Sequence, residues 1–444
     1  MFTKSTLIAA VSLIGVLGRP LAFSQNLELD KQVATDEARL LDIFKKIHAN
    51  PELSMQETET AALVAAEFKA NGYSVQTGIG KTGVVGVMKN GPGPVIMFRA
   101  DMDALPVKEE SGLPYASTKT GTTLDGLESA ITHACGHDAH VTWLIGVAKV
   151  MAEQKANWSG TLILLGQPAE EAYNGAEAMV KDGLYSKIPE PSVVFASHTN
   201  PVWPAGAVGL GEGRRMAGAD GLNVTIKGIG GHGSTPHASK DPIVMGAQAI
   251  MAYQTIVSRR IDQTEPVVLT VGAFQAGTVG NIIPDSATMR LSIRWYSKAA
   301  RDQIIAMVKQ MTDAIAVGNG MPADRMPVYE STSSITPVIN DDALVAQMRP
   351  VLEQALGKSN VYPGVPMQMG SEDFQMLGDP IKGVKLLHME VGVAKPGVAK
   401  GFMESGTMPA YMNHHPKFQV ELPAIAAGVK ANAAVLLELL KKDK

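Results

Sequence analysis

Helical periodicity dominates the first part of this chain. Apolar residues recur every three or four positions from about residue 35 to residue 69, which predicts helical structure, and Asn50-Pro51 interrupts the pattern. The pair Asn71-Gly72 is typical of a helix C-terminus. The other end of the chain, from residue 423 to about residue 441, also has the pattern of an amphipathic helix.

Short apolar runs after the first helical region predict the strands of a sheet. Three continuous runs occupy residues 94–98, 161–165 and 192–196, and two strand-like segments precede them at 73–77 and 83–89. Continuous runs of four to eight apolar residues are typical of strands buried on both faces of a mostly parallel sheet. The pattern therefore predicts an α/β fold with helices flanking a mostly parallel sheet.

Each of the three continuous runs leads into residues that can carry chemistry. The first leads into Asp101 and Asp103, the second into Glu170-Glu171, and the third into His198. In open α/β sheets the carboxyl ends of the strands form the edge at which ligands bind. We therefore expect the functional site at this edge.

The pattern changes near residue 216 and predicts a second domain. Strand-like and helical segments follow one another in strand-helix-strand-strand-helix-strand order, at residues 221–228, 242–258, 266–273, 287–296, 298–316 and 328–336. This order predicts a small α+β sandwich, inserted at 216–332 between two parts of a catalytic domain, 25–215 and 333–444. Two domains are also the prior expectation for a chain of 444 residues.

The first 24 residues have the pattern of a secretory signal. Lys4 precedes an apolar run at residues 7–17 that is too short to span a bilayer, and Ala22-Phe23-Ser24 offers small residues for cleavage. The alternative is an uncleaved membrane anchor. We predict export, to the periplasm or the medium, and a mature chain that does not associate with a membrane.

Composition narrows the expected partners and chemistry. The net charge is −4, the pI is near 6.2, and the chain has no basic tract, so we expect no nucleic-acid partner. The single cysteine, Cys135, cannot form an internal disulfide. It is therefore either a free thiol or a metal ligand.

A candidate metal site centres on His133-Ala-Cys-Gly-His-Asp-Ala-His140. Cys135 and His137, separated by one glycine, have the spacing of metal ligands; the alternative is a buried cysteine beside a surface histidine cluster. Further metal-capable groups are Glu170, Glu171, His198 and the pair His414-His415. Thiolate, imidazole and carboxylate together suit zinc or a similar divalent ion, and bridging groups allow two ions. One glutamate of the pair can ligate while the other acts as general base, unless the pair is a solvated surface feature.

Four ordered motifs carry a resemblance to a known family: Arg99-Ala-Asp-Met-Asp-Ala-Leu105, His133 to His140, Gln167-Pro-Ala-Glu-Glu171 and Gly370-Ser-Glu-Asp-Phe374. Together they resemble the M20 peptidase family, in particular its amidohydrolase branch of hippurate hydrolases, N-acyl-amino-acid amidohydrolases and auxin-conjugate hydrolases. The peptidase branches have histidine where this chain has Asp101, which favours the amidohydrolase branch.

The resemblance implies a role for each matching residue. The ligands of two divalent ions per subunit, Zn²⁺ or Mn²⁺ with Co²⁺ or Ni²⁺ also accepted, would be Cys135, His137, Glu171, His198 and His414. Glu170 would be the general base, and Asp103 would orient the ligands. His414 is preferred to His415 because the branch usually has its ligand two residues before a proline.

The resemblance also makes residues 216–332 a lid and dimerisation domain, and so implies a homodimer. Within this domain His232 would polarise the substrate carbonyl, often from the partner subunit. Asn281 and Arg294 would contact the carboxylate or amide of the substrate; the alternatives are a turn-forming asparagine and a solvated arginine.

The function implied by the resemblance is metal-dependent hydrolysis, by a metal-activated water, of the amide bond of N-acyl amino acids or related small amide conjugates. Two alternatives are a carboxypeptidase or dipeptidase that acts on short peptides, and a non-catalytic exported binding protein of the same fold.

Overall fold

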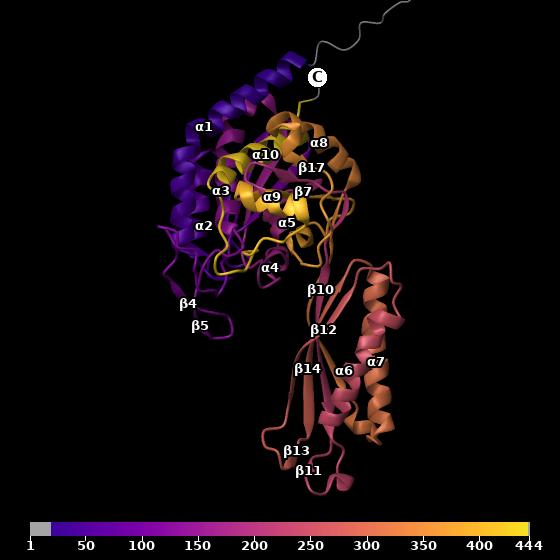
Figure 1. Ribbon diagram of the computed structural model, residues 1–444. Helices are drawn as coiled ribbons and strands as arrows, with labels where there is room; N and C mark the ends of the chain where they lie inside the picture. Colours follow the sequence, from indigo (N-terminus) through magenta and orange to yellow (C-terminus); the bar gives the residue numbers. More distant parts are fainter. Residues whose placement is uncertain (1–18, 443–444) are drawn as a thin grey trace, which may run out of the picture.

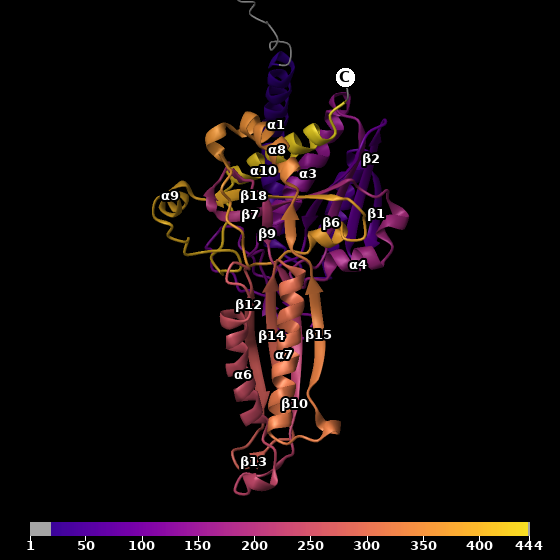
Figure 2. The same cartoon turned by 90° about the vertical axis from the view of Figure 1, so that its right-hand side faces the viewer.

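The computed structural model describes residues 19–442, so most of the predicted signal sequence lies outside the described residues. The chain forms a large unit and an elongated second unit that projects from it (Figure 1; Figure 2). No helix among the described residues has the length and apolar character that a membrane span requires.

The large unit is built on an eight-stranded sheet. Its strands stand in the order β1 (Ser74–Ile79), β2 (Gly83–Asn90), β6 (Gly160–Gln167), β3 (Val95–Asp101), β7 (Val193–Pro204), β18 (Lys385–Ala394), β8 (Val208–Gly209) and β17 (Val361–Tyr362). The four central strands, β6, β3, β7 and β18, are parallel, which confirms the predicted fold class. Their carboxyl ends therefore lie at one edge of the sheet.

Helices cover both faces of this sheet. One face packs against α1 (Arg19–Ala49), α2 (Thr58–Ala70), α3 (His137–Glu153), α8 (Asp342–Leu356) and α10 (Pro423–Leu439). The other packs against α4 (Gly175–Lys181) and α5 (Leu184–Lys187). Neighbouring residues of a strand point to opposite faces, so Phe98 joins the first core and Met97 the second. This two-sided burial is why β3 is a continuous apolar run.

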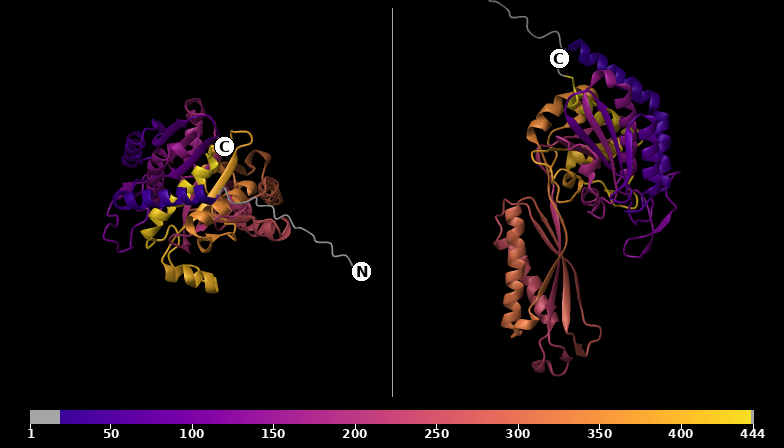
Figure 3. Two further views of the ribbon diagram at one scale, coloured as in Figure 1. Left: turned by 90° about the horizontal axis from the view of Figure 1, so that it is seen from above. Right: turned by 180° about the vertical axis from the view of Figure 1, so that it is seen from behind.

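The predicted N-terminal helical region is two helices, and the first begins earlier than expected. α1 starts at Arg19 rather than near residue 35, and it lies along the outside of the large unit (Figure 3). Leu29 and Val33 are buried in the same core as Leu40, so apolar spacing extends further towards the N-terminus than the pattern indicated. α1 ends at Ala49, one residue before the predicted interruption, and α2 ends before Asn71-Gly72, with Gly72 at a φ of +78°.

The second unit has the predicted strand and helix order. Its antiparallel sheet has the strand order β12 (Val268–Ala276), β14 (Ser286–Trp295), β10 (Gly218–Lys227) and β15 (Val328–Ile335). Two helices, α6 (Pro242–Arg259) and α7 (Lys298–Gly318), pack on this sheet around an apolar core. A short ribbon of β11 (Gly231–His232) and β13 (Ile282–Ile283) forms the tip farthest from the large unit (Figure 1).

Smaller elements complete the chain. They are β4 (Thr120–Thr122), β5 (Glu128–Ala130), β9 (Gly213–Met216), β16 (Val338–Asn340) and α9 (Pro396–Ser405).

Candidate metal centre

The carboxyl edge of the large sheet gathers the candidate ligands from segments far apart in the sequence. Asp101 ends β3, Glu170 and Glu171 follow β6, and His198 lies within β7. Cys135 and His137 enter from the loop that begins α3, where Gly136 has a φ of +86° that favours glycine.

Three of these side chains converge with spacings that suit a shared ion. Ligand atoms of Cys135, His137 and Glu171 all lie within 4.8 Å of one another. The His137 Nε2 atom is 3.8 Å from Glu171 Oε1. Atoms that bind one tetrahedral ion at about 2.0–2.3 Å lie roughly 3.3–3.8 Å apart. Both His137 ring nitrogens and Glu171 Oε1 are buried without a hydrogen-bond partner, so this donor set fits a metal ion.

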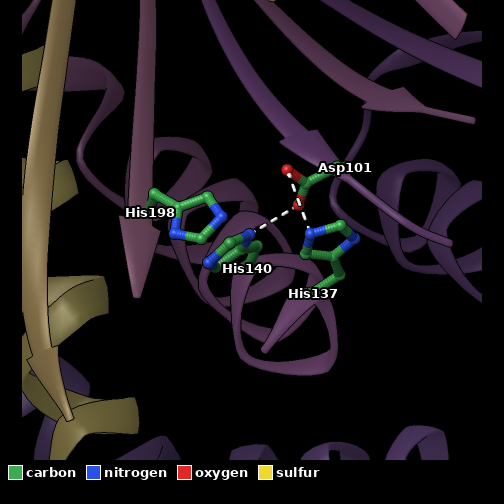
Figure 4. Close-up of side chains that lie close together, drawn as sticks. All are labelled: Asp101, His137, His140 and His198. Carbon is green, nitrogen blue, oxygen red and sulfur yellow. Dashed lines mark hydrogen bonds and ion pairs between the residues drawn. The ribbon is translucent and has the colours of Figure 1, made fainter. Parts of the chain in front are cut away.

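His198 and His140 lie close together at this edge, but only His198 has a ring nitrogen available to bind a metal ion (Figure 4). His198 Nδ1 donates to the Thr199 carbonyl at 2.8 Å, which leaves Nε2 facing Cys135 Sγ at 3.5 Å. His140 is bonded at both nitrogens: Nδ1 to Asp101 at 2.5 Å, and Nε2 as acceptor of the Thr199 N–H at 2.8 Å. His198 therefore has an available ligand atom and His140 has none.

Asp103 holds the turn that carries the two glutamates. Its two oxygens accept the backbone N–H groups of Glu170 at 3.0 Å and Glu171 at 3.1 Å. One of these oxygens is also 3.4 Å from His137 Nδ1. A single carboxylate therefore holds the backbone of both glutamates in place and lies beside the His137 imidazole.

The two histidines of the pair His414-His415 have different surroundings. The Nε2 atom of His414 lies 3.4 Å from Glu171 Oε1. The backbone N–H of His414 donates to the Ala134 carbonyl at 2.7 Å. His415 instead packs against the Tyr411 ring, and its Nδ1 accepts the Lys417 N–H. The structure thus places His414, and not His415, beside the other candidate ligands.

Glu170 lies on the side of the cluster where further acidic residues are buried. Burial, followed by the carboxylates of Glu372 and Glu171, raises the pKa of Glu170 well above its usual range. Arg99 balances this charge, because its guanidinium donates to Asp101 at 2.7 Å and to Glu372 at 2.8 Å. The sequence motif at residues 370–374 contains Glu372, but the pattern alone gave it no role.

The electrostatics of the cluster also favour a cation. Burial lowers the pKa of His137, but the carboxylates of Asp101 and Asp103 outweigh it and raise that pKa to about 10. Burial, and then Glu171 and Glu170, raise the pKa of the Cys135 thiol. These negative groups together require positive charge, which either protons or metal ions can supply.

The predicted residues of the second unit fall in two places. Arg294 lies at its base, where the guanidinium donates to Ser371 Oγ and sits 5.8 Å from the centre of the Tyr173 ring. His232 lies in β11 and Asn281 directly precedes β13, the two strands of the far tip (Figure 1), and the Asn281 carbonyl oxygen accepts the Gly233 N–H. Within one chain the structure does not bring His232 or Asn281 to the cluster.

A pocket of about 370 Å³ opens beside the cluster. Cys135, Glu170, Glu171, His198 and His414 line one side of it. The lining also includes an apolar wall, which contains Val202, Trp203, Phe402, Met408 and Met412. Trp203 is held in place by stacking on Tyr362 and by its indole N–H, which donates to buried Glu390 at 2.9 Å.

An α/β sheet whose carboxyl edge combines thiol, imidazole and carboxylate groups beside a pocket has the arrangement that a metal-dependent hydrolase requires. Residues 97–438 match the model of peptidase family M20/M25/M40, and the chain belongs to this family.

The similarity to individual proteins extends over most of the chain. The chain is 40% identical to hippurate hydrolase of Campylobacter jejuni over 334 residues, which cover 75% of this chain and 83% of that protein. A putative aminohydrolase from methicillin-resistant Staphylococcus aureus superposes with a TM-score of 0.81 at 28% identity, covering 94% of this chain and all of that one. The YXEP protein of Bacillus subtilis, a dinuclear metal-binding peptidase of the M20 family, superposes with a TM-score of 0.73 at 27% identity, covering 92% of this chain and 99% of that one.

Proposed function

We propose that this protein is an exported metal-dependent amidohydrolase that cleaves the amide bond of N-acyl amino acids. The observation that carries the proposal is the group of buried, unpartnered ligand atoms on His137 and Glu171, beside a pocket that also contains Glu170. The 40% identity between this chain and a hippurate hydrolase supports amide hydrolysis as the reaction, because hippurate is an N-acyl amino acid.

Five side chains would hold two divalent ions: Cys135, His137, Glu171, His198 and His414. When bound, the ions would lower the pKa of water and polarise the amide carbonyl. We infer zinc or manganese, although the same donors accept cobalt or nickel. The dinuclear site of the YXEP protein supports two ions rather than one.

Glu170 is the proposed general base. It lines the pocket and lies next to a ligand, so its carboxylate can accept a proton from water at the amide carbon and pass it to the departing nitrogen. Because its pKa is raised, the Glu170 carboxylate holds a proton more strongly and is a stronger base than an ordinary glutamate. Arg99 would keep Glu372 ionised and in place behind it.

The pocket supports an orientation for the substrate. The apolar wall of Trp203, Phe402 and Met412 suits the acyl group of a substrate. Arg294, at the base of the second unit, suits the carboxylate of the amino acid. His232 and Asn281 would reach a substrate only from a second subunit, which is the basis for proposing a homodimer.

The proposal of export rests on residues 1–24, whose sequence has the pattern of a cleavable signal. A buried metal thiolate at Cys135 would also be protected in an oxidising compartment.

Elemental analysis of the purified protein, combined with a substrate panel, tests this function. We expect about two ions per chain and hydrolysis of N-acetyl or N-benzoyl amino acids that a chelator abolishes and divalent metal restores. Cys135→Ala and His414→Ala should lower the metal content, whereas His415→Ala should retain it. Faster cleavage of dipeptides would favour a peptidase, and inactivity of the metal-loaded protein on the whole panel would favour a binding protein.

A further inference from the structure

The turn that carries Glu170 and Glu171 is held in an unusual backbone conformation. Ala169 has a φ of +49° and Tyr173 a φ of +51°, in the left-handed region that residues other than glycine adopt at a cost. Such a conformation persists only where surrounding contacts fix it.

Carboxylates capture three consecutive backbone N–H groups of this turn. The N–H groups of Glu170 and Glu171 donate to Asp103, as described above. The preceding N–H, that of Ala169, donates to Glu57 Oε1 at 2.8 Å. Hydrogen bonds to an ionised acceptor are among the stronger ones in proteins, so the pair Glu57 and Asp103 defines the path of the turn.

Both carboxylates are anchored by the short segment before α2, residues 54–57. Ser54 Oγ donates to Asp103 Oδ2 at 2.6 Å, while Glu57 is fully buried and also accepts from Thr82 Oγ1 at 2.5 Å. Burial and the nearby Asp103 carboxylate raise the pKa of Glu57 to about 7. Neither Ser54 nor Glu57 touches the pocket.

We propose that Glu57, with Ser54, is a positioning residue that fixes the left-handed turn at Ala169 and thereby places Glu171 for metal binding and Glu170 for proton transfer. This inference rests on the proposed function for the role of Glu170, but not for the conformation of the turn. Its signature is that the loss caused by removing Glu57 depends on the residue at position 169.

Five variants of the full-length, metal-loaded protein test this proposal. Glu57→Ala should lower both the affinity for Mn²⁺, measured by competition with a chelator, and kcat by about 10- to 100-fold, because groups that orient ligands typically contribute this much. Glu57→Gln can still accept the Ala169 N–H and can donate to Thr82 Oγ1, so it should remain within about threefold of the wild type. Glu57→Ala/Ala169→Gly should recover most of the lost affinity, since glycine adopts positive φ readily.

Thr82→Val is the matched control. It removes a hydrogen bond to the same carboxylate without touching the turn. It should lower the unfolding temperature while leaving Mn²⁺ affinity and kcat unchanged. If Glu57→Ala does not fold, Ala169→Val tests the turn from its other side, because a β-branched residue fits positive φ poorly, and should show the same loss of affinity.

Wild-type Mn²⁺ affinity in Glu57→Ala or in Ala169→Val would overturn the proposal. If Glu57→Ala folds, a failure of the added Ala169→Gly substitution to restore its Mn²⁺ affinity would also overturn it. A wild-type protein that binds metal but hydrolyses no substrate would refute the proposed function instead. The Mn²⁺ measurements would still decide the role of Glu57.

Discussion

The interiors of the two units differ in kind. The core of the second unit is formed by apolar side chains such as Val224, Met289 and Ile304, and among its described residues 218–335 the buried side chain of the Asp, Glu, His, Lys and Arg types is Asp220. The large unit buries many more ionisable groups at its sheet edge, including Arg99, Asp101, Asp103, His137, Glu170, Glu372 and Asp373.

This difference separates two tasks. Burying charge is costly unless each group is paired, so the site depends on a network in which every member needs the others. The second unit has no comparable network among its described residues and is stabilised mainly by apolar packing. Changes among the buried charges of the large unit should therefore affect chemistry and pH dependence, whereas changes in the apolar core of the second unit should affect stability alone.

The largest expected effect follows from Glu170→Gln. The amide has nearly the same shape as the carboxylate but cannot accept a proton, so kcat should fall about 10²- to 10⁴-fold while metal content is retained. Steady-state kinetics and elemental analysis measure the two quantities. Glu177→Gln, on the exposed surface of α4, is the control and should have wild-type kcat. Near-normal turnover in metal-replete Glu170→Gln would refute the assignment of the base.

A smaller effect, on stability, is expected for Ile304→Ala in α7. Ile304 is fully buried in the second unit, so the cavity should cost about 2–5 kcal/mol in the free energy of unfolding. Denaturant titration measures this, and Val317→Ala, an exposed position of the same helix, should change it by less than about 0.5 kcal/mol. The metal affinity of Ile304→Ala should equal that of the wild type. A marked fall in affinity would show that the two interiors are coupled.

The smallest effect concerns His48, which is buried in the large unit between Asp138 at 2.6 Å and Glu109 at 3.0 Å. Burial lowers the pKa of His48, but these partners raise it to about 10. Burial raises the pKa of Glu109, but its hydrogen bonds with His48 and then with Ser111 outweigh this and lower that pKa to about 2. Because the folded-state pKa of His48 is raised, its stabilisation is complete below the ordinary value of 6.5 and is lost as pH rises through about 10. The contribution of Glu109 is lost as pH falls from 4.5 through about 2.

His48→Gln should therefore cost about 1–3 kcal/mol in unfolding free energy at pH 5–6, and the difference from the wild type should shrink above pH 10. Urea titrations across this pH range measure the difference. The cost of Ile304→Ala should stay constant over the same range. A pH-independent cost for His48→Gln would mean that the histidine is not charged in the folded protein.

The sequence predicted the parts of the molecule that short-range patterns determine. The apolar run at residues 94–98 predicted a strand buried on both faces, and the polar residues Asp101 and Asp103 that follow it indicated the correct edge of the sheet. Both features could be predicted because each depends on only a few neighbouring residues. The order of elements in the second unit followed from its changes of period. The predicted start of the first helix, near residue 35, is too late, because the buried residues Leu29 and Val33 stand among polar residues that obscure the helical spacing.

What the sequence did not predict depends on distant contacts. β18 is a central strand, but its neighbour β7 is far away in the chain, and the pattern alone gave it no place. Glu57 and Ser54 look like ordinary residues before a helix, and only the structure brings them to Asp103 and Ala169. His140 lies in the same motif as Cys135 and His137 and was not among the predicted ligands, but only the structure gives the physical reason, which is that both of its ring nitrogens are hydrogen-bonded.

The pairing of β18 with β7 has a consequence for the order in which the protein can form during synthesis. Residues 218–335 are continuous and can fold once they have emerged, whereas the central sheet must wait for residues 385–394 and the site for His414. A chain that stops before this point would contain a folded second unit beside an open sheet without a complete set of ligands. Hydrolytic activity would therefore appear only in molecules that have been made almost to their end.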